Sequence, residues 1–276
     1  MDRIRLIASD MDATLLDEQS QLPADFEETI HALAELGIRF APASGRPLYT
    51  LEAMFPTLQD ELVFIGDNGG AIRWKGQNLF TSEMSPEGWR ALNRLTREQG
   101  DIAVLCGLES AYVERPFAVH DAVLRHFYTK IEYVDRLEDV AAPADKFTIY
   151  LPQHNAQQAY DTVYASQRSI YSVAVAGECW VDIMNPGVHK GAALQTLGQL
   201  WGLPSESIMA FGDTYNDAEM LQTVRYGFLM ENGSEPLRQK VPFLAPSHRE
   251  AGVMQVLHRV LAQNGCVCPE DFVLAH

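Results

Sequence analysis

The stretch LIASDMDATLL, residues 6 to 16, places two carboxylates two positions apart directly after an apolar run. Acidic side chains are costly at a buried strand end unless something there uses their charge. Asp10 and Asp12 are therefore candidates for chemistry. Two further apolar runs end similarly, residues 38–43 at Ser44 and residues 208–212 at Asp213. In open α/β sheets ligands bind outside the carboxyl ends of the strands, so these side chains should face one crevice if the strands are parallel neighbours.

The motif GDTYND adds Asn216 and Asp217 one helical turn beyond Asp213, which gathers four carboxylates with Asp10 and Asp12. Two like charges about 4 Å apart repel by roughly 4 kcal/mol at an effective dielectric constant of 20. Either the carboxylates stay protonated or a divalent cation compensates them. Because the donors are all oxygen, with no His or Cys at ligand spacing, they favour Mg²⁺ over zinc.

Lys190 stands at the predicted start of a helix, where a cation opposes the helix dipole. Such a helix gains nothing from the lysine, which suggests an anion nearby. An acidic cluster, a hard cation and one lysine together describe a phosphate site.

Elements that would position these residues alternate at both ends of the chain. Apolar runs predict strands over 4–9, 38–44, 61–66 and 208–212. Helical periodicity predicts helices over 23–37, from 190 to 201, through 221 and over 249–262. Strands and helices in short alternation indicate an α/β fold with a parallel sheet. The pair Asn68-Gly69 is a hairpin signal.

Between about 84 and 185 the pattern changes to several short strand candidates, among them DIAVLC, KFTIYLP and CWVDIM, separated by helical stretches. Neighbouring strands lie close enough in the sequence for hairpins, which indicates an α+β unit with an antiparallel sheet. We therefore predict a parallel-sheet domain of residues 1–83 and 186–276, interrupted by an α+β domain of residues 84–185.

Composition bounds the partners. The 276 residues are 47% hydrophobic and 21% charged, as in ordinary globular proteins. A net charge of −16 argues against nucleic acid or an anionic membrane as a partner. No run of 18 apolar residues occurs, no signal peptide is recognised, and four scattered cysteines form no disulfide framework. These features predict a cytoplasmic protein.

Four motifs in order, SDMDATLL, APASGR, the Lys190-Gly191 pair and FGDTYNDAEML, resemble those of haloacid-dehalogenase-superfamily phosphatases. DNGGAI and SHREAGVMQVL are similar to the Cof-like branch, whose type C2 α+β cap is inserted between the second and third motifs. The resemblance implies a Rossmann-like core, a cap, and hydrolysis of a small phosphorylated metabolite. One departure is Ala13, which stands where many relatives carry glycine; its methyl group should fit if φ stays negative.

The resemblance also implies roles for these residues. Asp10 would attack phosphorus and form an aspartyl-phosphate, and Asp12 would act as general acid and base. Asp10, the Asp12 carbonyl and Asp213 would hold Mg²⁺. The remaining positions would act around the phosphoryl group: Ser44 and Lys190 on its oxygens, Asn216 and Asp217 on phosphate, metal waters or Lys190, and Thr14 on the nucleophile loop.

Other interpretations stay open at this point. Asp10 and Asp12 could cap a turn, Ser44 could belong to a plain turn, and Lys190 could be a solvated lysine. A calcium loop fails, because Leu15 and Gln21 stand where glycine and glutamate are required. Arg46 could contact substrate or pair with a carboxylate. The same aspartate would also serve a phosphomutase or phosphotransferase, and a phosphometabolite sensor without turnover is a further alternative.

Overall fold

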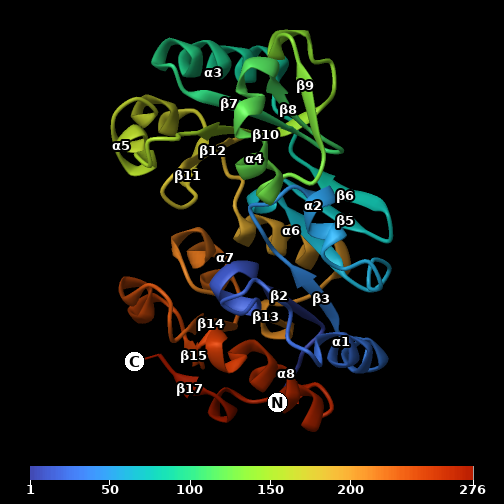
Figure 1. Ribbon diagram of the computed structural model, residues 1–276. Helices are drawn as coiled ribbons and strands as arrows, with labels where there is room; N and C mark the ends of the chain where they lie inside the picture. The colour runs from blue at the N-terminus through green and yellow to red at the C-terminus, as the bar shows by residue number, and fades with distance from the viewer. Residues whose placement is uncertain (276) are drawn as a thin grey trace.

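The computed structural model describes residues 1–275 and contains two large sheets, one above the other in Figure 1. Both chain termini lie at the lower end, beside the lower sheet. This arrangement confirms the predicted α/β fold with a parallel sheet and an additional α+β unit. No helix among the described residues is long and apolar enough to span a bilayer.

The lower sheet has the strand order β17-β15-β14-β13-β2-β3, and its five inner pairings are parallel except that of β17 with β15. Its strands are β2 (Leu6–Ser9), β3 (Arg39–Pro42), β13 (Ile208–Gly212), β14 (Tyr226–Met230), β15 (Phe243–Ala245) and β17 (Val273–Leu274). A short pair, β1 (Asp2–Arg3) with β16 (Cys266–Val267), lies near the N-terminus.

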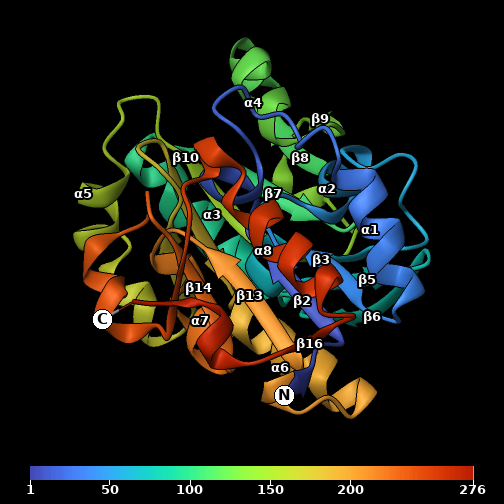
Figure 2. The same cartoon turned by 90° about the horizontal axis from the view of Figure 1, so that it is seen from below.

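Helices cover both faces of the lower sheet, which explains why its strands are apolar throughout rather than alternating (Figure 2). Alternate side chains such as Ile7 and Phe40 pack against α1 (Phe26–Glu35) and α8 (Gly252–Ala262). Their neighbours, such as Leu6 and Ala8, pack against α6 (Lys190–Trp201) and α7 (Ala218–Thr223) on the opposite face.

A small antiparallel sheet of β4 (Val63–Gly66), β5 (Ala71–Trp74) and β6 (Gln77–Thr81) adjoins β3, beside helix α2 (Leu48–Ala53). A parallel bridge between Ala43 and Ile65 joins β4 to the lower sheet. Asn68 and Gly69 form the turn between β4 and β5, which confirms the predicted hairpin.

The upper sheet has the order β11-β12-β10-β7-β8-β9 and is antiparallel except between β8 and β9. Its strands are β7 (Ile102–Gly107), β8 (Ala111–Glu114), β9 (Ile131–Val134), β10 (Ala144–Tyr150), β11 (Ser172–Val175) and β12 (Trp180–Met184). Helices α3 (Pro86–Gln99) and α5 (Ala156–Asp161) pack on one face, and α4 (Asp121–Phe127) on part of the other. β9 and α4 were not expected from the sequence.

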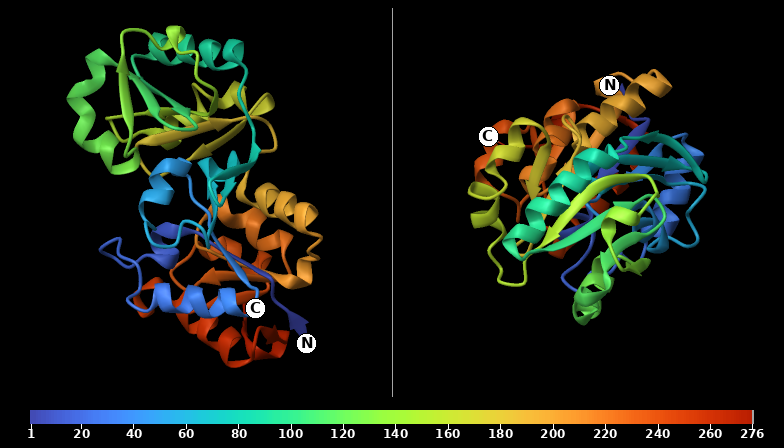
Figure 3. Two further views of the ribbon diagram at one scale, coloured as in Figure 1. Left: turned by 90° about the vertical axis from the view of Figure 1, so that its right-hand side faces the viewer. Right: turned by 90° about the horizontal axis from the view of Figure 1, so that it is seen from above.

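The chain passes between the two parts twice, after β6 and after β12, and the left-hand view of Figure 3 shows both crossings. Asn185 ties them together, because its side-chain amide donates to the carbonyl oxygens of Ser82 (3.3 Å) and Glu83 (2.8 Å). The position of the upper sheet over the lower one is therefore set by a two-stranded connection.

Candidate active site

A cavity of about 1270 Å³ lies between the carboxyl ends of the lower strands and the upper sheet. Asp10, Asp12, Ser44, Asp213 and Asn216 all line it. The adjacent parallel pairing of β13, β2 and β3 brings their ends together, as the sequence predicted. Lys190 is fully buried directly beneath these residues.

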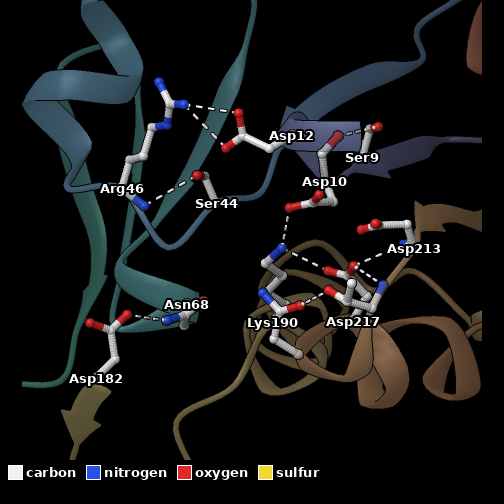
Figure 4. Close-up of polar contacts among 12 residues, drawn as sticks. Ser9, Asp10, Asp12, Ser44, Arg46, Asn68, Asp182, Lys190, Asp213 and Asp217 are labelled. Carbon is white, nitrogen blue, oxygen red and sulfur yellow. Dashed lines mark hydrogen bonds and ion pairs between the residues drawn. The ribbon is translucent and has the colours of Figure 1, made fainter. Parts of the chain in front are cut away.

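Lys190 is the first residue of α6, and its ammonium group points at two carboxylates (Figure 4). It forms a hydrogen-bonded ion pair with Asp10 and a second one with Asp217 at 2.7 Å. The helix begins here because the His189 Nδ1 atom accepts a hydrogen bond from the Ala192 amide. Burial opposes the charge of Lys190, but the two carboxylates outweigh burial and raise the pKa of its ammonium group.

Asp217 uses both carboxylate oxygens within the protein. One oxygen accepts from Lys190, and the other accepts from the backbone amides of Asp213 (3.0 Å) and Thr214 (3.3 Å). Gly212 makes this possible, since a Cβ atom there would lie 2.4 Å from the Cβ of Asp217. The sequence left open what Asp217 positions; the structure places it on Lys190 and on the Asp213 loop.

Oxygen atoms of Asp10, Asp213 and Asp217 lie within 4.8 Å of one another. Burial raises the pKa of Asp10 well above its ordinary value, and burial together with the Asp217 charge raises the pKa of Asp213 to about 7. One lysine cannot compensate three buried carboxylates. Because Asp217 is fully engaged, Asp10 and Asp213 are the carboxylates available to a cation, and an all-oxygen donor set fits Mg²⁺.

Asp12 is half-exposed, with 57% of its side chain accessible. Its carboxylate accepts two hydrogen bonds from one guanidinium nitrogen of Arg46, at 2.9 and 3.1 Å (Figure 4). The sequence left Arg46 undecided between substrate and a carboxylate; the structure pairs it with Asp12. The only signal for it was its place two residues after Ser44.

Ser44 is buried at the end of β3, in a turn that faces the cavity. Its hydroxyl oxygen accepts from the Arg46 backbone amide at 3.1 Å, and its carbonyl oxygen accepts from the Asn68 amide at 2.9 Å. The hydroxyl keeps its proton free to donate toward the cavity.

Ala13 corrects one expectation. Its φ is +58°, in the left-handed region, whereas the sequence interpretation required a negative φ. This conformation costs a non-glycine residue about 1–2 kcal/mol. Asn232 stabilises the turn, since its side-chain amide donates to the Ala13 carbonyl oxygen at 2.8 Å. Sequence reasoning missed Asn232, which lies more than two hundred positions away.

Two other predicted residues take minor positions. The Asn216 side-chain oxygen accepts from the Thr214 hydroxyl at 2.6 Å, at the rim of the cavity. Thr14 is buried behind the nucleophile loop, and its hydroxyl has no hydrogen-bond partner within residues 1–275. Nothing in the structure gives Thr14 a contact that would steady this loop.

Lys146, on β10 of the upper sheet, was also missed. Its buried ammonium group donates to the carbonyl oxygen of Gly45, next to Ser44, and lies 3.1 Å from Asp67 and 3.5 Å from Asp182. Asn68 adds a second link across the two parts, donating to Asp182 at 2.9 Å. The upper part thus touches the Ser44 turn directly.

Comparison with known proteins places this geometry in a family. The haloacid dehalogenase-like hydrolase family matches residues 7–257. A 5-amino-6-(5-phospho-D-ribitylamino)uracil phosphatase of Escherichia coli K12 is 31% identical, over 94% of this chain and 96% of that protein. An HMP-PP phosphatase of Cronobacter sakazakii is also 31% identical, over 87% and 89% of the two chains.

Solved structures agree with this placement. A crystal structure from Streptococcus mutans UA159 has 28% identity and a TM-score of 0.85, covering 94% of this chain and 99% of that one. A haloacid dehalogenase-like hydrolase from Bacteroides thetaiotaomicron shares the fold at 22% identity, with a TM-score of 0.81 over 94% and 100% of the chains. The chain therefore belongs to the haloacid dehalogenase-like hydrolases, as its four motifs predicted, and is an enzyme of the phosphatase type.

Proposed function

We propose that the enzyme is a Mg²⁺-dependent phosphatase that hydrolyses a small phosphorylated metabolite through an aspartyl-phosphate on Asp10. The observation that carries this proposal is the convergence of Asp10, Lys190 and Asp213 at the floor of one cavity. The names of the two 31% identical relatives, both phosphatases, support the same chemistry.

In the first half-reaction an Asp10 oxygen attacks phosphorus, and the bond from phosphorus to the leaving oxygen breaks. Asp12 donates a proton to that oxygen, so the leaving group departs as an alcohol. In the second half-reaction Asp12 takes a proton from water, the water oxygen attacks phosphorus, and inorganic phosphate leaves with Asp10 restored.

Lys190 and the Ser44 hydroxyl would donate to phosphoryl oxygens, which offsets negative charge in the transition state. Asp217 would keep Lys190 charged and aimed at Asp10. Asp10 and Asp213, with the Asp12 carbonyl, would hold Mg²⁺, which when bound offsets carboxylate repulsion and polarises the phosphoryl group.

Residues 84–185 would form the cap and residues 1–83 and 186–276 the catalytic core. Closing the cap over the cavity would exclude bulk water and select the leaving group. A small metabolite, rather than a nucleic acid, matches such an enclosed site and the charge of −16. The four cysteines are free, which supports a cytoplasmic location.

The test is release of inorganic phosphate from p-nitrophenyl phosphate, with Mg²⁺ and with a chelator. We expect activity only with the metal, and a loss of at least 10³-fold in Asp10→Asn because nucleophilic attack is removed. Asp60→Asn is the matched control, since Asp60 is exposed and outside the cavity. Substantial turnover by Asp10→Asn would remove Asp10 as the nucleophile, and full activity in the chelator would remove the metal.

A further inference from the structure

The cavity is far larger than a phosphoryl group requires. Drug-sized ligands occupy cavities of about 300–1,000 Å³, and this one has about 1270 Å³. It extends from Asp10 and Ser44 on the lower strands to side chains of β10 and β12 on the upper sheet. Its roof, rather than its floor, therefore decides which leaving group fits.

The roof has an order that follows from strand register. On β10 and β12, Lys146 pairs with Met184, Thr148 with Asp182, and Tyr150 with Trp180. Alternate residues of a strand share one face and lie about 6.6 Å apart. Because Lys146 touches Gly45 beside Ser44, the first pair lies nearest the phosphate floor and the third pair farthest from it.

The middle of this row offers hydrogen-bond acceptors. Asp182 lines the cavity, and its carboxylate accepts from the Thr148 hydroxyl at 2.7 Å and from the Asn68 amide at 2.9 Å. With Lys146 3.5 Å away, three of about four acceptor positions are used. The remaining one is suited to a hydroxyl or amino donor on the ligand.

The far end of the row is aromatic. Phe127, Tyr128 and Trp180 line the cavity. The rings of Phe127 and Trp180 pack edge to face with centroids 5.0 Å apart, and Tyr150 supports Trp180 from 4.6 Å. Rings that line a polar cavity gain from covering a flat apolar surface.

We propose that the substrate is a phosphomonoester whose leaving group carries hydroxyl or amino donors next to the phosphate and ends in a planar aromatic ring. Asp182 binds the donors, and Phe127 and Trp180 bind the ring. This proposal rests on the phosphatase function proposed above and names its substrate class.

The test compares three kinds of substrate with Mg²⁺ present: ribose 5-phosphate, which has donors and no ring; the four nucleoside 5′-monophosphates and riboflavin 5′-phosphate, which have both; and p-nitrophenyl phosphate as a general phosphatase substrate. We expect the best ring-bearing compound to exceed ribose 5-phosphate at least tenfold in kcat/KM. Equal or better hydrolysis of ribose 5-phosphate would overturn the substrate class. No hydrolysis of any compound, p-nitrophenyl phosphate included, would overturn the phosphatase function instead.

Variants then assign the ring contact to residues. Phe127→Ala should lower the ratio of the two kcat/KM values, ring-bearing over ring-free, at least fivefold. Phe117→Ala is the matched control, because Phe117 is equally half-buried against the same cluster of the upper sheet and does not line the cavity. Trp180→Phe should lower the ratio less than Trp180→Ala, and it guards against misfolding. An unchanged ratio in Phe127→Ala and Trp180→Ala would show that the rings only pack the cap.

Asp182→Asn tests the donor contact separately. The substitution should lower kcat/KM for ribose 5-phosphate more than for p-nitrophenyl phosphate, which offers no donor. Equal losses on the two substrates would assign Asp182 to folding alone and would overturn its part in recognition.

Discussion

Asp12 has to face the leaving oxygen in order to give and later take a proton, and Arg46 determines where its carboxylate points. The two hydrogen bonds at 2.9 and 3.1 Å hold a side chain that is otherwise half-exposed. Arg46 itself is mostly buried, with 12% of its side chain accessible, so it is the better-fixed partner. We therefore interpret Arg46 as a positioning residue for the general acid.

Arg46→Ala should lower kcat about 10–100-fold on an alkyl phosphate and much less on p-nitrophenyl phosphate. General acid catalysis contributes about 10²–10⁴-fold and matters most when the leaving oxygen is strongly basic. Steady-state kinetics on the two substrates measure the difference. Arg94→Ala, at an exposed arginine of α3, is the control. If both substrates lose activity equally, Arg46 contacts the phosphate rather than Asp12.

Ala13 shows where residue-level reading stops. A negative φ was a fair expectation for alanine, because the left-handed region is unfavourable for it. The actual φ of +58° is set by the tight turn after β2 and by Asn232, whose contact comes from the opposite end of the chain. No local pattern carries that information.

At the level of elements, sequence reasoning succeeded where one short segment decides the outcome. Helix Lys190–Trp201 was expected with its exact limits, since apolar periodicity and Gly202 bound it. The strand ends at Asp10, Ser44 and Asp213 followed from apolar runs and the parallel-sheet pattern.

Elements defined by distant partners escaped prediction. Strand Ile131–Val134 is only partly buried and weakly apolar, and it exists because β8 pairs with it. Lys146 looked like an ordinary strand lysine in KFTIYLP, yet the register of β10 with β12 buries it between two carboxylates. Its contact with Gly45 spans about a hundred positions.

The buried cluster between the two parts yields a paired prediction on stability. The charges of Asp182 and Asp67 outweigh burial and raise the pKa of Lys146, so it stays charged. Lys146→Met would leave those carboxylates without their cation, at a cost of about 3–5 kcal/mol. For a chain of this size that corresponds to a fall of the order of 10 °C in the unfolding temperature.

Asp145→Asn is the informative contrast. Burial first, and the Asp67 charge second, raise the pKa of Asp145 well above its ordinary value, so this carboxyl is neutral at pH 7. An isosteric amide should therefore change the unfolding temperature by no more than about 2 °C. Calorimetry of both variants at pH 7 measures the two shifts. Similar losses in both would mean that Asp145 is ionised and that the charge assignment is wrong.

For the molecule as a whole, the site adds buried negative charge to a chain whose net charge is already −16. A carboxyl with a raised pKa binds a proton in the folded state that the unfolded chain releases. Asp213, with a pKa of about 7 against 3.8 unfolded, therefore makes the metal-free protein less stable as pH rises between these values. A bound divalent cation would offset this loss.

Stabilisation by Mg²⁺ should consequently depend on pH. Below about pH 7 protons compete for Asp213, and the raised pKa of Asp10 adds to the competition, so metal affinity falls. Since a ligand stabilises by RT ln(1 + [L]/Kd), the rise in unfolding temperature at a fixed Mg²⁺ concentration should be larger at pH 8 than at pH 6. Thermal unfolding with Mg²⁺ and with a chelator measures it at each pH. Asp213→Asn should abolish the rise at both pH values and Asp60→Asn should keep it, whereas an equal rise at pH 6 and pH 8 would place the metal away from these carboxylates.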